Sequence, residues 1–201
     1  MTIQEKINKK IEIAEKRILE LTKSNNLVRL DDKDRYLLSK FYQIKSENRL
    51  KTAKLIFNAS KENKDDYRDY AEVVAASYYA MYYIIHSFLA LKYKTKLKEL
   101  VRGVHAITEH VILYYLVKTK KLAQHLYEEY LSALKTTAQI NKLSPEDFQE
   151  QAFGYAEKYD KVRSDRETFT YNVTPSIEEF HAKQAIDTAE EFISTVKGVM
   201  E

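Results

Sequence analysis

Glycine and proline are scarce in this chain: its 201 residues include only three Gly and two Pro. In average proteins these two residues together make up about 12% of the chain. β-Sandwiches and barrels reverse direction at many tight turns that depend on Gly and Pro. Dinucleotide sites and P-loops need a glycine-rich loop, which three scattered glycines do not supply. The scarcity therefore predicts an all-α protein without a glycine-rich phosphate loop.

The rest of the composition predicts one folded domain with a short N-terminal appendage. Hydrophobic residues make up 44% of the chain, which is enough for a proper core. The 33 Lys and Arg nearly balance the 30 Asp and Glu, so we do not expect a dedicated DNA-wrapping protein, while a local basic patch is compatible with these numbers. The absence of Cys excludes disulfides and Cys-ligated metal sites. The opening MTIQEKINKK lacks the apolar core of a signal peptide, so we expect a cytoplasmic protein, and the abundance of Lys, Glu, Ile and Tyr suggests a prokaryotic one.

Residues 1–33 are predicted to form one unit, a helix followed by a polar connector. Within this helix, apolar residues at steps of three or four form a narrow seam of Ile3, Ile7, Ile11, Ala14, Ile18 and Leu21. Such a seam is typical of a helix that packs against one partner helix, in its own chain or in a second copy. In the connector, Asp31 and Asp32 are candidate caps for the next helix.

Residues 34–201 are predicted to form an up-and-down helical bundle, to which the N-terminal helix is an addition. The apolar periodicity places helices at about 34–63, 67–92, 97–118, 122–139, 145–166 and 175–199. Asp65 or Asp66 can cap the second of these, and Ser144 followed by Pro145 is typical of a helix start. The predicted apolar face of helix 34–63 consists of Leu37, Phe41, Ile44, Ala53, Ile56 and Phe57. That of the last helix consists of Ala182, Ala185, Ala189, Phe192 and Val196.

Residues 73–91 contain no Asp, Glu, Lys or Arg and have the length of a membrane-spanning helix. Their four Tyr, two Ser and His86 would all need polar partners within a bilayer. A central helix surrounded by other helices explains this segment better, so we expect no membrane association.

Tyrosines at i,i+4 spacing form two stripes on this helix, Tyr78/Tyr82 and Tyr79/Tyr83. Tyr supplies a large apolar area and one hydrogen bond, which suits a core or a subunit interface. The alternative is a platform on which nucleic-acid bases stack. We favour packing, because most of this helix must be buried.

His105 and His110 suggest a metal site, but they are five residues apart, which places them about 140° apart around a helix. A zincin helix needs a spacing of four, so we expect no metal ion here and no other cofactor. His105 and Glu109 have the i,i+4 spacing of an ordinary pair on a helix surface.

Basic side chains gather in two clusters, one at Lys92, Lys94, Lys96, Lys98 and Arg102 and one at Lys118, Lys120 and Lys121. Such clusters either keep a surface soluble or attract phosphate. Lys98 and Arg102 are the candidates for nucleic-acid contacts in the first cluster.

Four segments in order resemble the HEPN family of small helical prokaryotic proteins over residues of about 45–200. Residues 75–83 (AASYYAMYY) are similar to the family's A-x-S-Y-Y-A-M helix, and residues 102–105 (RGVH) to its basic-x-x-His stretch. Residues 166–171 (RETFTY) resemble an R-x-x-A-D-Y variant of the family's Arg-x4–6-His motif. Residues 182–193 resemble its closing A-x-x-F-I helix.

The resemblance implies a dimeric helical bundle, in which active members cut RNA without metal through Arg and His side chains at the dimer interface. It also implies a partner for many members, a small nucleotidyltransferase antitoxin. Here Tyr171 stands five residues after Arg166, where the motif has His. An unperturbed Tyr has a pKa near 10 and is a poor general base at neutral pH. Arg163 and Arg166 remain able to hold a phosphate through their guanidinium forks.

We therefore expect a homodimeric, HEPN-like protein that binds RNA or nucleotides in a toxin–antitoxin or defence setting, with weak or no nuclease activity. The first alternative is an active metal-independent ribonuclease that uses Arg166 with His105 or Tyr171. The second is a pure protein-interaction module that uses the N-terminal seam and the Tyr stripes. Tyr171 is also a candidate acceptor for modification by a partner nucleotidyltransferase.

Overall fold

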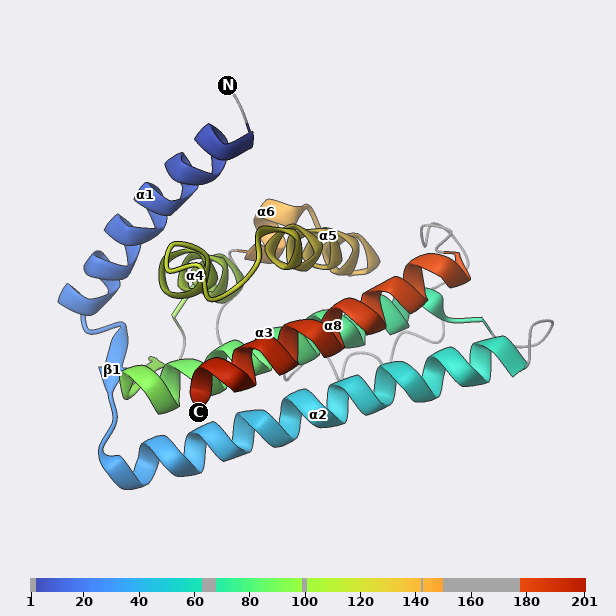
Figure 1. Cartoon of the computed structure of the whole chain (residues 1–201), viewed down its shortest axis with the longest axis horizontal. Helices are drawn as coiled ribbons and strands as arrows, with labels where there is room; N and C mark the ends of the chain where they lie inside the picture. The colour runs from blue at the N-terminus through green and yellow to red at the C-terminus, as the bar shows by residue number, and fades with distance from the viewer. Residues whose placement is uncertain (1–2, 63–67, 99–100, 142, 150–177) are drawn as a thin grey trace.

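The computed structural model describes residues 3–62, 68–98, 101–141, 143–149 and 178–201, with the side chains of residues 3 and 4 left undescribed. It confirms an all-α helical bundle with an additional N-terminal helix (Figure 1). The helices are α1 (Ile3–Lys23), α2 (Asp32–Glu62), α3 (Tyr70–Tyr93), α4 (Val104–Val111), the π-helix η1 (Ile112–Val117), α5 (Gln124–Ile140), α6 (Pro145–Gln149) and α8 (Glu179–Met200). Two strands, β1 (Leu27–Arg29) and β2 (Thr95–Leu97), pair at one end of the bundle.

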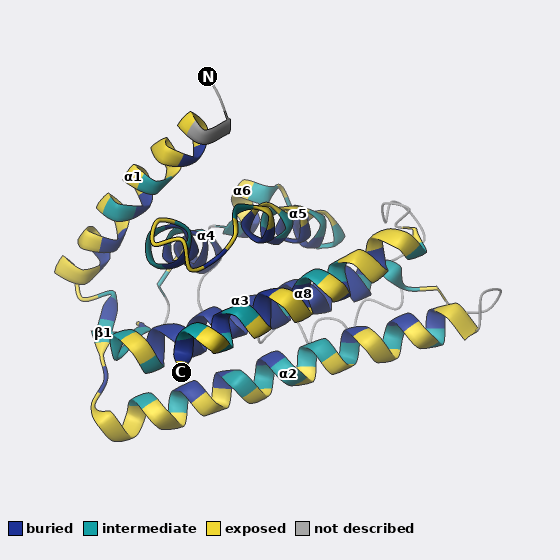
Figure 2. Ribbon diagram, in the orientation of Figure 1, coloured by how far each residue is buried: buried dark blue, intermediate teal, exposed yellow. Residues whose placement is uncertain are grey.

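Helix α3 is the centre of the fold and contacts α2, α5 and α8. In Figure 1, α2, α3 and α8 run across the view, whereas α4 and α5 are seen nearly end-on. All residues of α3 from Val73 to Ala90 except Tyr79 are buried, and Figure 2 colours much of its visible ribbon as buried. Among the described residues, α3 is the one helix long and apolar enough to cross a membrane, and 94% of its apolar window is buried inside the protein. The prediction of a central helix surrounded by others is confirmed.

Helix α1 packs through its seam against α4 and η1 of the same chain. Ile7, Ala14, Ile18 and Leu21 are buried, and Ile11 is half-buried. Lys118, the residue directly after η1, forms an ion pair of 2.7 Å with Glu15 of α1. The seam therefore serves packing within the chain, and it is not available as a docking face for another protein.

The strands were not predicted: the sequence prediction has residues 94–96 in a connector and a helix from about residue 97, where the structure has strand β2. Leu27 pairs with Leu97, and Arg29 with Thr95, in antiparallel register. Gly103 then adopts a φ of 77°, a left-handed conformation open to glycine, at the position before α4. Helix α4 consequently begins at Val104, later than the predicted start, and the strands join the connector before α2 to the connector after α3.

Helix caps agree in part with the prediction. Asp31 accepts a hydrogen bond of 2.7 Å from the Asp34 amide, and Ser144 accepts one of 3.0 Å from the Asp147 amide, so both predicted caps are confirmed. Helix α3 is instead capped by Asp69, whose carboxylate accepts from the Glu72 amide at 3.1 Å. The predicted caps Asp65 and Asp66, the end of the helix at 145–166 and the start at 175 lie outside the described residues.

The apolar face predicted for α2 is wrong for Leu37, Phe41 and Ile44, which are all exposed. Small residues at every seventh position face α3 instead: Ser39, Ser46, Ala53 and Ser60. At about 100° per residue, these small residues lie on the side of α2 opposite Leu37, Phe41 and Ile44. Ala53 and Phe57 do face inward, as predicted, and Ile56 is half-buried. The small side chains allow α2 to lie close to α3, and two of their hydroxyls bond to it directly, Ser46 to the Ala80 carbonyl at 2.7 Å and Ser39 to Ser87 at 2.8 Å.

We expect Ser46→Leu to lower the free energy of unfolding by about 2–4 kcal/mol, because it overfills the α2–α3 contact and removes a buried hydrogen bond. Asn48→Leu is the matched control, since it places the same side chain on the exposed side of the same helix. Urea denaturation monitored by circular dichroism measures both. Equal stability of the two variants would show that α2 does not depend on close approach at Ser46.

Candidate functional site

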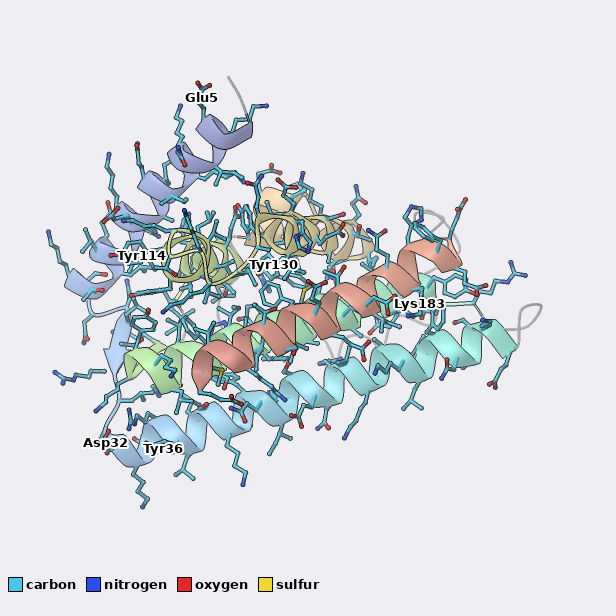
Figure 3. All side chains as sticks on the ribbon, in the orientation of Figure 1. Glu5, Asp32, Tyr36, Tyr114, Tyr130 and Lys183 are labelled. Carbon is cyan, nitrogen blue, oxygen red and sulfur yellow. The ribbon has the colours of Figure 1, made fainter. Side chains whose placement is uncertain are left out.

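The described residues contain two sets of side chains that bear on chemistry, one buried and one exposed. The buried set is an aromatic cluster at the centre of the bundle, made of Tyr78, Tyr82, His86, His105, Tyr130 and Phe148. Each of these residues is at most 3% exposed. Tyr130 lies in the middle of the molecule in Figure 3. The prediction that Tyr78 and Tyr82 serve packing is confirmed, and their rings are not available to stack on bases.

His105 lies within this buried aromatic cluster. Its Nδ1 is 2.7 Å from the Tyr78 hydroxyl, and its ring stacks on Phe148 at a centroid distance of 4.2 Å. Burial, together with nearby His86, lowers the pKa of His105 to about 3, so the ring is neutral at pH 7. The ring has no exposed surface, and contact with RNA would require the surrounding helices to open. In this geometry His105 cannot act on RNA, so it does not support the ribonuclease alternative.

His86 is the second buried histidine, and burial lowers its pKa to about 3 as well. Its Nε2 lies 3.2 Å from the Thr108 hydroxyl, which itself bonds to the Val104 carbonyl at 2.7 Å. A hydroxyl has one hydrogen, and Thr108 donates it to Val104. Nε2 of His86 therefore carries the ring proton and donates to Thr108. This assignment makes His86 a neutral structural histidine.

Glu109 does not form the predicted surface pair with His105. It is 8% exposed and accepts hydrogen bonds of 2.7 Å from both Tyr127 and Gln149. Nζ of Lys10 in α1 forms an ion pair of 3.2 Å with the same carboxylate. The carboxylate thus joins α1, α4, α5 and α6, because a buried charge is stable only when hydrogen-bond donors surround it. Its role in the described structure is to hold the N-terminal helix on the bundle.

No group of three or more His, Asp or Glu side chains within the described ranges is placed to hold a metal ion. His110, the other half of the suspected metal pair, is half-buried on α4. Burial lowers its pKa, and its Nδ1 has no hydrogen-bond partner among the residues that the structure describes.

The exposed set lies at the end of the bundle that carries the strands. The described residues 29–45, 92–98, 101 and 102 together hold ten Lys and Arg against three Asp and Glu, although the whole chain has an excess of only three basic residues. Asp32 is moreover neutralised by Lys94 at 2.8 Å and Arg35 at 3.1 Å. The hydrogen bond and charge of Lys94, with the charge of Arg35, lower the pKa of the Asp32 carboxyl. Figure 3 shows Asp32 and Tyr36 at this end, and Lys183 at the other. We call this region the strand-end surface.

Lys98 and Arg102, predicted as nucleic-acid contacts, both belong to the strand-end surface. Both are exposed, and neither forms an ion pair with a described residue. Lys98 directly follows β2 and its amide donates to the Asn26 carbonyl at 2.9 Å, which fixes its backbone beside the connector before α2. The structure thus brings basic residues from two distant parts of the sequence onto one surface.

Arg163, Arg166 and Tyr171 lie outside the described residues. The predicted phosphate contacts of Arg163 and Arg166, and the predicted catalytic role or modification of Tyr171, therefore stay predictions.

The strand-end surface contains a hollow that was not predicted from the sequence. Leu30, Asp34, Leu37, Leu38, Phe41 and Lys96 line this hollow of about 350 Å³. Two of these residues, Leu37 at 60% and Phe41 at 47% exposure, belong to the face of α2 that was expected to be buried. The small residues spaced by seven on α2 are the signal that could have indicated this face.

Comparison of the chain with protein-family models, with curated proteins and with solved structures finds no match.

Proposed function

We propose that this protein is a dimeric, HEPN-like RNA-binding protein with weak or no nuclease activity, acting in a toxin–antitoxin or defence setting. The observation that carries the proposal is the excess of positive charge on the strand-end surface, in a chain that is otherwise nearly neutral. Exposed Lys and Arg side chains neutralise phosphates and release their counterions, which supplies most of the affinity of non-specific nucleic-acid binding.

The arrangement of the sequence motif supports the same proposal. Arg163 and Arg166 offer further guanidinium groups for phosphate, and Tyr171 in place of His predicts weak or no cleavage. His105 is buried and neutral, so it does not replace the missing histidine. A nucleotidyltransferase partner and modification of Tyr171 belong to the proposal through the family resemblance.

Binding of a fluorescein-labelled 20-nucleotide single-stranded RNA, followed by anisotropy, tests the proposal. We expect the variant Lys98→Gln/Arg102→Gln to bind about 10-fold more weakly than the wild type at low salt, because it loses two phosphate contacts. Lys61→Gln/Lys183→Gln removes two charges near the opposite end of the bundle and should bind like the wild type. The same RNA should stay largely intact in EDTA.

A wild-type protein that binds no RNA at low salt would end the proposal. Equal weakening in the two double variants would show that only net charge matters, and not the strand-end surface. Rapid cleavage in EDTA that is lost in Arg166→Ala would favour the ribonuclease alternative.

A further inference from the structure

The hollow of the strand-end surface combines apolar walls with charge at its rim. Of its apolar lining residues, Leu30 is buried, whereas Leu37 and Phe41 of α2 are exposed. Lys96 of β2 and Asp34 of α2 supply the polar groups. Exposed apolar patches rimmed by polar residues mark interaction sites. A hollow of about 350 Å³ is at the small end of the range for ligand sites, so it fits one flat group and not a whole chain segment.

The charge around the hollow decides what occupies it. Lys33 and Lys40 are exposed on the same helix, and Lys45 Nζ lies 4.8 Å from the centroid of the Phe41 ring. A second copy of this chain would bring an equally positive surface against the first, which costs free energy. A polyanion gains from the same charges. The occupant with matching chemistry is therefore a flat apolar group carried by a phosphate backbone.

We propose that this hollow takes one unpaired base of single-stranded RNA, stacked on the Phe41 ring, with an adjoining phosphate on Lys96. The proposal rests on the RNA-binding function proposed above. Aromatic rings stack on bases of any sequence, and the carboxylate of Asp34 accepts a hydrogen bond from an amino group on the base. A paired base is buried in its duplex and does not enter, so the site selects single strands.

Phe41→Leu tests the proposal, because it keeps an apolar side chain while it removes the stacking face. Phe41→Tyr keeps the ring, and Leu55→Ala is the control on the exposed side of the same helix, where Leu55 is 70% exposed. The probes are a labelled 12-nucleotide single-stranded RNA and a 12-base-pair RNA duplex, both followed by anisotropy. Sedimentation velocity of each protein gives its oligomeric state.

We expect Phe41→Leu to bind the single strand about 10-fold more weakly, with Phe41→Tyr and Leu55→Ala close to the wild type. Duplex binding should be the same in all four proteins. If the wild type binds RNA and Phe41→Leu binds it equally well, the base site is wrong while the RNA-binding function stands. If the wild type binds no RNA, both proposals fail. If Phe41→Leu changes the oligomeric state and not the RNA affinity, the hollow serves a second copy, which overturns the base site.

Discussion

Replacement of Tyr78 by Ala should lower the free energy of unfolding by about 3–5 kcal/mol, the range for removing a large ring from a packed core. Tyr78 is fully buried on α3, and its ring contacts those of His105, Tyr130 and Phe148 from three other helices. The substitution leaves a cavity where α3, α4, α5 and α6 meet, and these helices close it only in part. Urea denaturation of the whole chain measures the loss.

Two further variants separate the causes of this effect. Tyr78→Phe keeps the ring and removes the hydroxyl that lies 2.7 Å from Nδ1 of His105. We expect this variant to lower the free energy of unfolding by about 1–3 kcal/mol, because it leaves a buried polar atom without its hydrogen-bond partner. Tyr36→Ala is the matched control, since Tyr36 is 56% exposed at the start of α2. A loss for Tyr78→Ala no larger than that for Tyr36→Ala would contradict the position of Tyr78 in the core.

Acidification from pH 7 to pH 5 should destabilise the protein by about 4 kcal/mol through His86 and His105 together. Burial lowers the pKa of each histidine to about 3 in the folded chain, whereas an unfolded His has a pKa near 6.5. Between these values the unfolded state binds protons that the folded state does not. Stability is therefore complete above about pH 6.5 and falls as the pH drops towards 3.

His86→Gln isolates the effect, because the Gln amide can still donate to Thr108 but does not titrate. Between pH 7 and pH 5, we expect the free energy of unfolding of this variant to fall by about 2 kcal/mol less than that of the wild type. His125→Gln is the control, since His125 is exposed on α5. Denaturation midpoints at several pH values supply the data. If all three proteins share the same pH dependence, the pKa of His86 does not differ between the folded and the unfolded chain.

The helices could largely be predicted from the sequence, because each carries its own apolar period. The seam of α1 and the uncharged run of α3 are local patterns, and both elements form as predicted. The strands could not be predicted in this way. They are three residues each, and α2 and α3 separate Leu27 from Leu97 in the sequence. Short pairings between distant segments have little local signal.

The faces of the helices were harder to predict than the helices themselves. Leu37, Phe41 and Ile44 have the spacing of a core face, but α3 packs against the small residues on the other side of α2. His105 likewise has the appearance of a surface residue beside Glu109. It lies three residues before Thr108, and both point into the core. Which face of a helix is buried depends on how the sizes of its side chains match those of the neighbouring helix. The sequence of one helix alone does not show this match.

The salt dependence of RNA binding tests the central claim most directly, namely that the strand-end surface holds RNA through its phosphates. The dissociation constant of the 20-nucleotide single strand is measured from low to physiological salt for the wild type and for Lys98→Gln/Arg102→Gln. Each lost phosphate contact lowers the slope of log affinity against log salt by about 0.7, so we expect the slopes to differ by about 1.4. Identical slopes for the two proteins, or a wild type without measurable affinity at the lowest salt, would contradict the account.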